Sequence, residues 1–132
     1  MATAAKENTN QAGSTRMIKI KRIYESAEDD DGTRILVDRL WPRGVTKSAA
    51  RIDGWLKEIA PSNELRKWFA HDIKRWERFK TRYGQELEQK KDMIDELRSL
   101  SKRGTVTLVY SAKDELHNQA VVLKEIMEKL ET

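Results

Sequence analysis

A repeat of apolar side chains from Ile73 to Leu100 constrains the fold more than any other feature of the sequence. These side chains recur at steps of three, four or seven residues, which is the period of one face of a helix. A helix over this whole segment would be about 40 Å long, and Gly84 is where we expect a kink or a break. Arg103 and Gly104 are typical of its C-terminal end.

Three segments have the pattern of strands. Residues 17–24 alternate apolar and basic side chains, as in a half-exposed strand. Residues 34–40 contain the continuous apolar run 35–37, which is typical of a strand covered on both faces. Residues 105–110 are rich in β-branched side chains. Because helices separate the last two strands, we expect a right-handed crossover and parallel pairing. The sequence therefore predicts an α/β fold with a small, mainly parallel sheet of three or more strands flanked by helices.

Three further helices are predicted. Residues 48–59 have helical spacing, although Gly54 weakens the pattern. Ser62 is a good N-cap for the next helix, whose buried stripe is Leu65, Trp68 and Phe69. His71 and Asp72 form a corner, with Asp72 as a cap. The final helix is expected over residues 113–130.

Length and composition point to one domain inside the cell. The 132 residues suffice for one core. Residues 1–16 lack an apolar period and are predicted to be a disordered tail, which leaves residues 17–132 as a single domain. The chain has no cysteine and only two histidines, so disulfides are excluded and a metal site is not expected. No apolar run is long enough to span a membrane, and residues 1–16 lack the apolar centre of a signal peptide, so we expect a cytoplasmic protein.

The charge balance favours anionic partners without choosing among them. The formal net charge is +4, which suits a metabolite, a nucleotide or a nucleic acid. The densest basic stretches, residues 74–75 and 90–91, are interrupted by acidic residues. We therefore interpret them as solvated helix faces.

Polar residues gather where two predicted strands end. Ligands in open α/β sheets bind beyond the carboxyl ends of the strands, and these ends are residues 38–44 and 110–114. If the two strands are neighbours, the two segments share a rim. An anion would be held by basic side chains at or near this rim, namely Arg39, Arg43, Lys47, Arg66 and Lys113. Lys57 is a further ligand-binding candidate.

Acid–base and wall residues are also predicted. Asp38 or His71 would act as acid or base, and Trp41 or Tyr83 would line the pocket. The structural alternatives are that Asp38 orients an arginine or caps a turn, that Trp41 belongs to the core, and that His71 packs at a corner. Arg43 can turn back over the strand end, so Asp38 and Arg43 should face the same cleft, near Lys113 or Asp114.

Ser111 could have a structural role in place of a ligand-binding one. Ser111 and Asp114 have the spacing of a capping box, which would make Ser111 the N-cap of the last helix. A serine nucleophile would need an adjacent base, and the motif Gly-x-Ser-x-Gly is absent. The phosphate-loop and dinucleotide-binding motifs are absent as well.

Several segments together resemble a known family. They are Val-Asp-Arg-Leu-Trp-Pro-Arg-Gly at 37–44, residues 55–62, residues 65–71, residues 106–114, and the set Phe79, Tyr83, Glu86, Leu87, His117, Asn118 and Ala120. In these segments the chain resembles the YeaO-like proteins, one branch of a bacterial and archaeal family of unknown function (domain of unknown function 488). The resemblance extends from Met17 to the C-terminus. It implies an α/β fold and a cytoplasmic protein but no reaction, cofactor or substrate.

The motif residues of this family mostly coincide with the rim. We therefore add Ser111, Asp114 and Asn118 to the ligand-binding candidates. The sequence favours a small-molecule enzyme or binding protein for an anionic ligand, such as a nucleotide or a phosphorylated metabolite. The alternative is an accessory protein that binds nucleic acid, which would need a continuous basic strip. Neither the cofactor nor the oligomeric state follows from the sequence.

Overall fold

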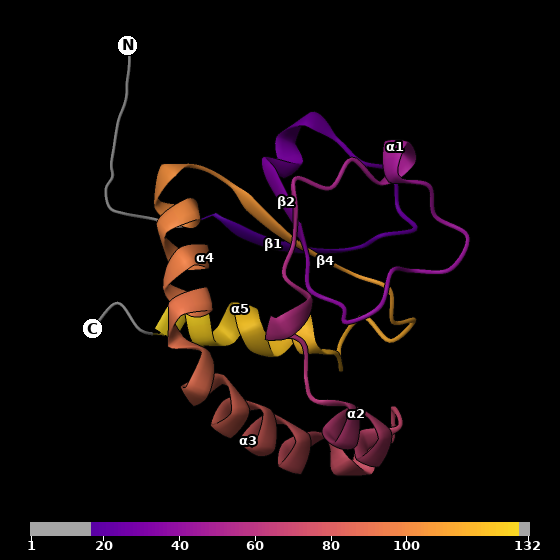
Figure 1. The fold of residues 1–132 in the computed structure, drawn as a ribbon, viewed down its shortest axis with the longest axis vertical. Helices are drawn as coiled ribbons and strands as arrows, with labels where there is room; N and C mark the ends of the chain where they lie inside the picture. Colours follow the sequence, from indigo (N-terminus) through magenta and orange to yellow (C-terminus); the bar gives the residue numbers. More distant parts are fainter. Residues whose placement is uncertain (1–16, 130–132) are drawn as a thin grey trace.

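Four short strands form an all-parallel sheet. In a computed structural model that describes residues 17–129 (Figure 1), the strands are β1 (Ile18–Arg22), β2 (Thr33–Leu36), β3 (Gly54–Trp55) and β4 (Val106–Tyr110), in the order β1-β4-β2-β3. Ile18 and Thr33 both lie opposite Val106, so β4 lies between β1 and β2. The predicted α/β fold is confirmed. The predicted tail, residues 1–16, and residues 130–132 lie outside the described residues.

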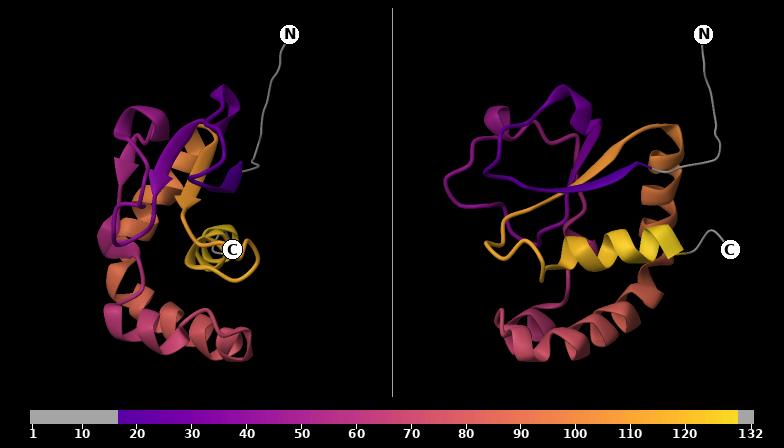
Figure 2. Two further views of the ribbon diagram at one scale, coloured as in Figure 1. Left: turned by 90° about the vertical axis from the view of Figure 1, so that its right-hand side faces the viewer. Right: turned by 180° about the vertical axis from the view of Figure 1, so that it is seen from behind.

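The helices differ in length and position. In chain order they are α1 (Lys47–Ala50), α2 (Asn63–Phe69), α3 (Trp76–Leu87), α4 (Lys91–Arg103) and α5 (Gln119–Lys129). Four 3-10 turns accompany them, at Asp29–Asp31, Lys57–Ile59, Ile73–Arg75 and Glu88–Lys90. Figures 1 and 2 show α3 passing beneath the sheet and α5, with α4 rising from its end.

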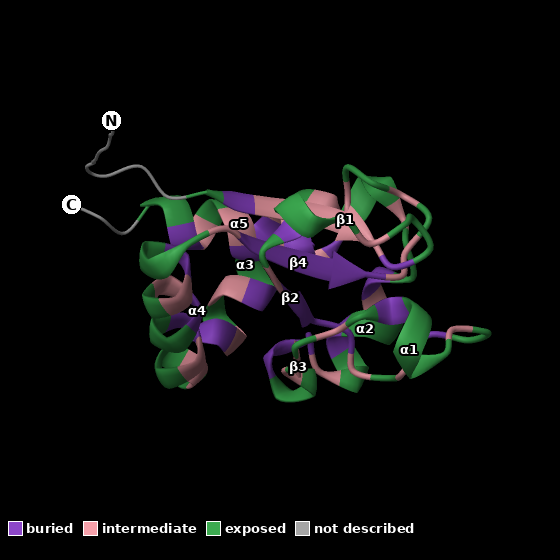
Figure 3. Ribbon diagram, turned by 90° about the horizontal axis from the view of Figure 1, so that it is seen from above, coloured by how far each residue is buried: buried purple, intermediate pink, exposed green. Residues whose placement is uncertain are grey.

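The two faces of the sheet pack against different parts of the chain. Ile35, Val37 and Leu108 pack with α2–α5 in the main core. Leu36 and Val109 point to the other face, where they pack with α1 and the loop that precedes it. The predicted two-sided covering of residues 35–37 is therefore confirmed. As Figure 3 shows, this covering leaves β2 and β4 almost wholly buried, whereas β1 is half-exposed.

The long helix is present, but its break does not lie at Gly84. Gly84 lies inside α3, and the helix is interrupted at the 3-10 turn Glu88–Lys90. The Lys90 ammonium group donates hydrogen bonds to the carbonyls of Glu58 and Ala60, which holds this turn against the segment that follows β3. The break follows from this contact between distant segments and not from a local helix breaker.

The predicted helix over residues 48–59 is mostly wrong. Within this segment α1 ends at Ala50, Lys57–Ile59 forms only a 3-10 turn, and Arg51 adopts a left-handed conformation with φ of 49°. Gly54 pairs with Ile35, which makes β3 the edge strand. The Leu56 N–H donates to the Leu36 carbonyl at 3.0 Å. Pairing with β2 has overridden the helical spacing.

The last helix begins six residues later than predicted, at Gln119 and not at Lys113. The side-chain oxygen of Asn118 accepts the N–H groups of Ala120 at 2.9 Å and Val121 at 3.2 Å, so Asn118 is the cap. The predicted capping role of Ser111 is wrong. By contrast, the Ser62 hydroxyl accepts the N–H of Leu65 and the Asp72 carboxylate accepts that of Lys74, so both of these predicted caps are confirmed.

Candidate functional site

A cavity of about 390 Å³ lies at the carboxyl ends of the strands. β2 and β4 are neighbours, so the rim predicted from the sequence exists. The loop after β2, the loop after β4, the start of α5 and the α2–α3 region all contribute to the wall. The lining residues are Tyr24, Asp38–Arg43, Ala60, Pro61, Arg66, Phe69, His71, Phe79, Ser111, Ala112 and His117–Gln119.

Asp38 is a buried carboxylate in this wall. One of its oxygens accepts the Ser111 N–H at 3.0 Å, and the other accepts the Gln119 side-chain amide at 2.5 Å. Burial raises the pKa of Asp38, and hydrogen bonds from Ser111 and Gln119 offset this only in part. Among residues 17–129, no basic side chain lies within ion-pair distance of it. Asp38 therefore joins β2, β4 and α5 at the rim without a countercharge.

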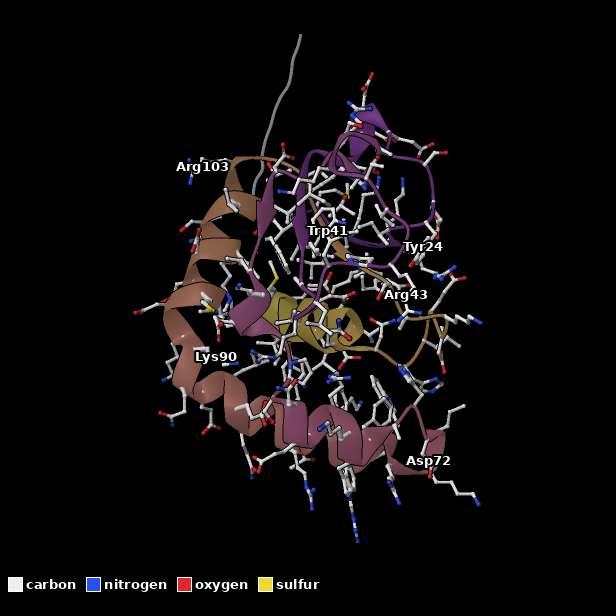
Figure 4. The ribbon with its side chains drawn as sticks, turned by 45° about the vertical axis from the view of Figure 1, so that its right-hand side comes forward. Tyr24, Trp41, Arg43, Asp72, Lys90 and Arg103 are labelled. Atoms are coloured by element: carbon white, nitrogen blue, oxygen red, sulfur yellow. The ribbon has the colours of Figure 1, made fainter. Side chains whose placement is uncertain are left out.

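Aromatic side chains hold the loop after β2 in place by donating hydrogen bonds to its carbonyl groups. The Trp41 indole donates to the Val45 carbonyl at 2.7 Å, and the Trp55 indole donates to the Asp38 carbonyl at 2.7 Å. The Tyr24 hydroxyl donates to the carbonyl of Arg43 at 2.9 Å, and Figure 4 shows these two residues side by side. Gly44, with φ of 77°, then turns the chain. Arg43 thus lines the cavity with its carbonyl held by Tyr24.

The guanidinium groups of the three arginines in the cavity wall differ in their hydrogen-bond partners. Arg39 donates to the carbonyls of Ala60 at 3.1 Å and Pro61 at 3.3 Å, so its guanidinium holds the wall. Arg66 donates to the neutral side chain of Asn63 at 3.3 Å. Within the described part of the chain, the guanidinium groups of Arg43 and Arg66 have no carboxylate partner. These two are the cations that remain for a ligand.

Aromatic rings from α2 and α3 also line the cavity. Phe69 and Phe79 are stacked, with ring centroids 4.4 Å apart, and His71 lies 6.0 Å from Phe69. The ring of His117 contacts Trp76 edge-on at 5.1 Å, and its Nδ1 lies 3.0 Å from the Asp114 carboxylate. A ligand here would meet both flat aromatic surfaces and guanidinium groups.

The structure brings together most of the predicted site residues but not all of them. Asp38, His71, Arg39, Trp41, Arg43, Arg66, Ser111 and Asn118 all line the cavity. Lys47, Lys57, Tyr83, Lys113 and Asp114 do not. Tyr83 is fully buried, and its hydroxyl donates to the Ile59 carbonyl at 2.7 Å. Lys57 lies over the Trp55 ring, and Asp114 caps a turn by accepting the N–H of Leu116. The predicted proximity of Asp38 and Arg43 holds, but neither Lys113 nor Asp114 reaches their cavity.

Sequence reasoning missed several wall residues. His117 and Gln119 were not expected in the site because the last helix was predicted to begin too early. Tyr24, Pro61 and Phe69 were missed because their contribution depends on long-range packing. The only available signal was the presence of His117, Pro61 and Phe69 in the family motifs.

One acidic group away from the cavity has the spacing of a metal site. Oxygen atoms of Glu28, Asp30 and Asp31 lie within 4.8 Å of one another. Asp31, however, pairs with Lys21 at 2.9 Å and with Arg34 at 2.7 Å. Basic side chains therefore already supply the positive charge that this group requires.

Comparison with known proteins assigns the family. The model of a family described as the inactive DUF488-N3 subclade matches residues 17–132. The uncharacterised protein YeaO of Escherichia coli is 44% identical over 113 residues, which cover 86% of this chain and 98% of that protein. The uncharacterised protein Rv3073c of Mycobacterium tuberculosis is 39% identical over 110 residues, which cover 83% and 92%. The chain belongs to the YeaO-like DUF488 family. No solved structure matches it significantly, and among the described residues no helix has the length and apolarity to cross a membrane.

Proposed function

We propose that the cavity binds a small anionic molecule, such as a nucleotide or a phosphorylated metabolite. The observation that supports this most directly is that Arg43 and Arg66 line the cavity without a carboxylate partner among residues 17–129. Planar guanidinium groups bind phosphate and carboxylate oxygens in pairs of parallel hydrogen bonds. A bound anion would satisfy both groups.

The shape and the walls of the cavity fit a ligand that is partly aromatic. The volume of about 390 Å³ is within the range of small-molecule sites. Phe69, Phe79 and Trp41 offer apolar surface, and Pro61 extends it. A nucleotide combines a flat base with a phosphate, so it would use both kinds of wall.

Binding is a better inference than catalysis. The description of the subclade as inactive favours a protein that holds its ligand without converting it. Both oxygens of Asp38 already accept hydrogen bonds that link secondary-structure elements. Acid–base roles for Asp38 and His71 stay predictions, and the binding proposal does not need them.

The proposal is tested by titrating the wild type and three variants with phosphate compounds. Isothermal titration calorimetry with nucleoside monophosphates, sugar phosphates and the matched uncharged nucleosides shows whether binding requires the phosphate group. Arg43→Met and Arg66→Met should each weaken binding roughly tenfold or more, because a hydrogen bond between charged groups contributes about 1.5–3 kcal/mol. Lys47→Met is the matched control, since Lys47 is exposed and outside the cavity. Equal losses in all three variants, or no binding by any phosphate compound, would contradict the proposal.

The alternative function, nucleic-acid binding, requires a continuous basic strip. The cavity is not such a strip, because its arginines are set among aromatic side chains and beside the Asp38 carboxylate. That function would have to use another surface.

A further inference from the structure

The excess positive charge of the chain is concentrated in one region. Between residues 63 and 83 there are seven Lys and Arg side chains and three Asp and Glu side chains, a net charge of +4. This equals the formal net charge of the whole chain, so the other residues balance. The segment corresponds to α2, the corner after it and most of α3. The basic residues are interleaved with acidic ones in sequence, but among the described residues only Arg75 and Lys80 of the seven pair with an acid.

Three arginines share one side of this region. Arg75, Arg78 and Arg82 follow one another at steps of three and four residues, so they lie along one face of α3 and of the turn that precedes it. All three are exposed. Arg78 makes no hydrogen bond or ion pair among residues 17–129, so its guanidinium is free to bind a partner.

Trp68 of α2 extends this row of arginines. The guanidinium carbons of Arg82 and Arg75 lie 4.3 Å and 5.2 Å from the centre of its ring. Both guanidinium groups are therefore held over an aromatic surface, although they remain exposed. We call Trp68, Arg75, Arg78 and Arg82 the α2–α3 basic face.

The acidic groups of the region leave this face positive. Asp72 lies 3.7 Å from Arg75, and Glu77 pairs with Lys80 at 3.7 Å. These are exposed pairs, which contribute little and are weakened by salt. The third acid, Glu64, is exposed on α2, which also carries the basic residues Arg66 and Lys67. Arg78 and Arg82 have no acidic partner within the described range.

We propose that the α2–α3 basic face binds single-stranded nucleic acid. Exposed guanidinium groups bind phosphate oxygens, and the Trp68 ring with its two guanidinium groups offers flat surfaces for unpaired bases. An acidic protein would match the charge but would make no use of these flat surfaces. The three arginines extend over about 10 Å along the helix, which suits contacts to two or three phosphates. This surface does not include Arg43 and Arg66, the two arginines proposed to bind an anion in the cavity, so the two proposals stand or fall independently.

The test is fluorescence anisotropy with a labelled single-stranded oligonucleotide of about 12 nucleotides, titrated at several salt concentrations. With three phosphate contacts, the slope of log affinity against log salt should be roughly −2, so affinity should fall about fifteenfold between 50 and 200 mM salt. Arg78→Gln with Arg82→Gln should weaken binding about tenfold at 50 mM salt and reduce the slope by about 1.4.

The matched control removes the same charge elsewhere. Lys102→Gln with Arg103→Gln alters two exposed residues at the end of α4, and Figure 4 shows Arg103 at the opposite end of the molecule from Asp72. This control should bind like the wild type, and circular dichroism should show both double variants folded. Absence of binding at 50 mM salt, or an equal loss in the control, would overturn the proposal. Equal competition by polyglutamate would also overturn it, because the face would then recognise charge alone, as an acidic protein would.

Discussion

Two buried aspartates flank β2, and they are stabilised in different ways. Asp31 precedes the strand and accepts hydrogen bonds from Lys21 at 2.9 Å, from Arg34 at 2.7 Å and from the Glu28 N–H at 3.0 Å. Asp38 follows the strand and accepts only uncharged donors, from Ser111 and Gln119. One carboxylate is therefore surrounded by cations, while the other has free arginines in the same cavity but none within reach.

The pKa values of the two carboxyl groups move in opposite directions. Burial alone would raise the pKa of Asp31, but hydrogen bonds from Glu28, Lys21 and Arg34 outweigh it and hold the pKa well below its usual range. Burial raises the pKa of Asp38, and its uncharged donors do not compensate. The comparison indicates that the Asp31 region is built for stability, whereas the Asp38 region leaves charge unpaired in the manner of a binding site.

The largest effect is expected from Asp31→Asn. This change leaves the buried Arg34 without its carboxylate partner and leaves Lys21 paired with Glu28 alone, which should reduce the free energy of unfolding by about 3–5 kcal/mol. Urea denaturation measures it. Asp30→Asn is the matched control, because the Asp30 side chain is 83% exposed and, among residues 17–129, pairs only with Lys19. It should change stability by less than about 1 kcal/mol. If Asp31→Asn lowers the free energy of unfolding by less than about 1 kcal/mol, Asp31 does not stabilise the fold more than Asp38 does.

Acid titration should reveal the same ion-pair network in the wild type. Because the folded-state pKa of Asp31 is depressed, its contribution is complete above the ordinary value of 3.8 and is lost as the pH falls toward the folded-state value. The wild type should therefore lose stability below about pH 4 more steeply than Asp31→Asn does. Urea midpoints measured for both proteins from pH 6 down to pH 3 test this. Parallel curves would mean that Asp31 is not ion-paired in solution.

A smaller effect, with the opposite dependence on pH, is expected for Asp38→Asn. A raised folded-state pKa means that folding favours the neutral acid, so the wild type loses stability as the pH rises from 3.8 through the folded-state value. Asn keeps an acceptor for the Ser111 N–H, and rotation of the Gln119 amide restores the second hydrogen bond. The variant should be within about 1 kcal/mol of the wild type at neutral pH, and should gain on it as the pH rises through that window. A loss of 3 kcal/mol or more would make Asp38 a structural residue.

The smallest effect on stability is expected for Arg43→Met. The side chain is exposed and has no carboxylate partner among residues 17–129, so the free energy of unfolding should change by no more than about 0.5 kcal/mol. The same variant should lose most of its affinity for an anionic ligand. Thermal unfolding with and without that ligand measures both quantities. A marked loss of stability in the free protein would show that Arg43 holds the loop and is not available to a ligand.

Structural features that depend on residues close together in the sequence were determined by the sequence alone. The continuous run Ile35–Val37 predicts a strand covered on both faces, and the caps Ser62 and Asp72 are found where local hydrogen bonding places them. The carboxyl ends of two adjacent parallel strands also follow from pattern and topology. For this reason the position of the rim, with Asp38, Arg43 and Ser111, is predictable from the sequence.

Tertiary structure decided which other residues join that rim. Phe69 and Phe79 reach the cavity because α2 and α3 pack beneath the strand ends, and His117 reaches it because α5 begins at Gln119. The break at Glu88–Lys90 and the pairing of Gly54 with Ile35 likewise depend on contacts between segments that are far apart in sequence. Periodicity and capping are set by residues a few positions apart, so a sequence displays them directly. The location of a cavity wall depends on which distant surfaces pack together, and that is decided only when the whole chain folds.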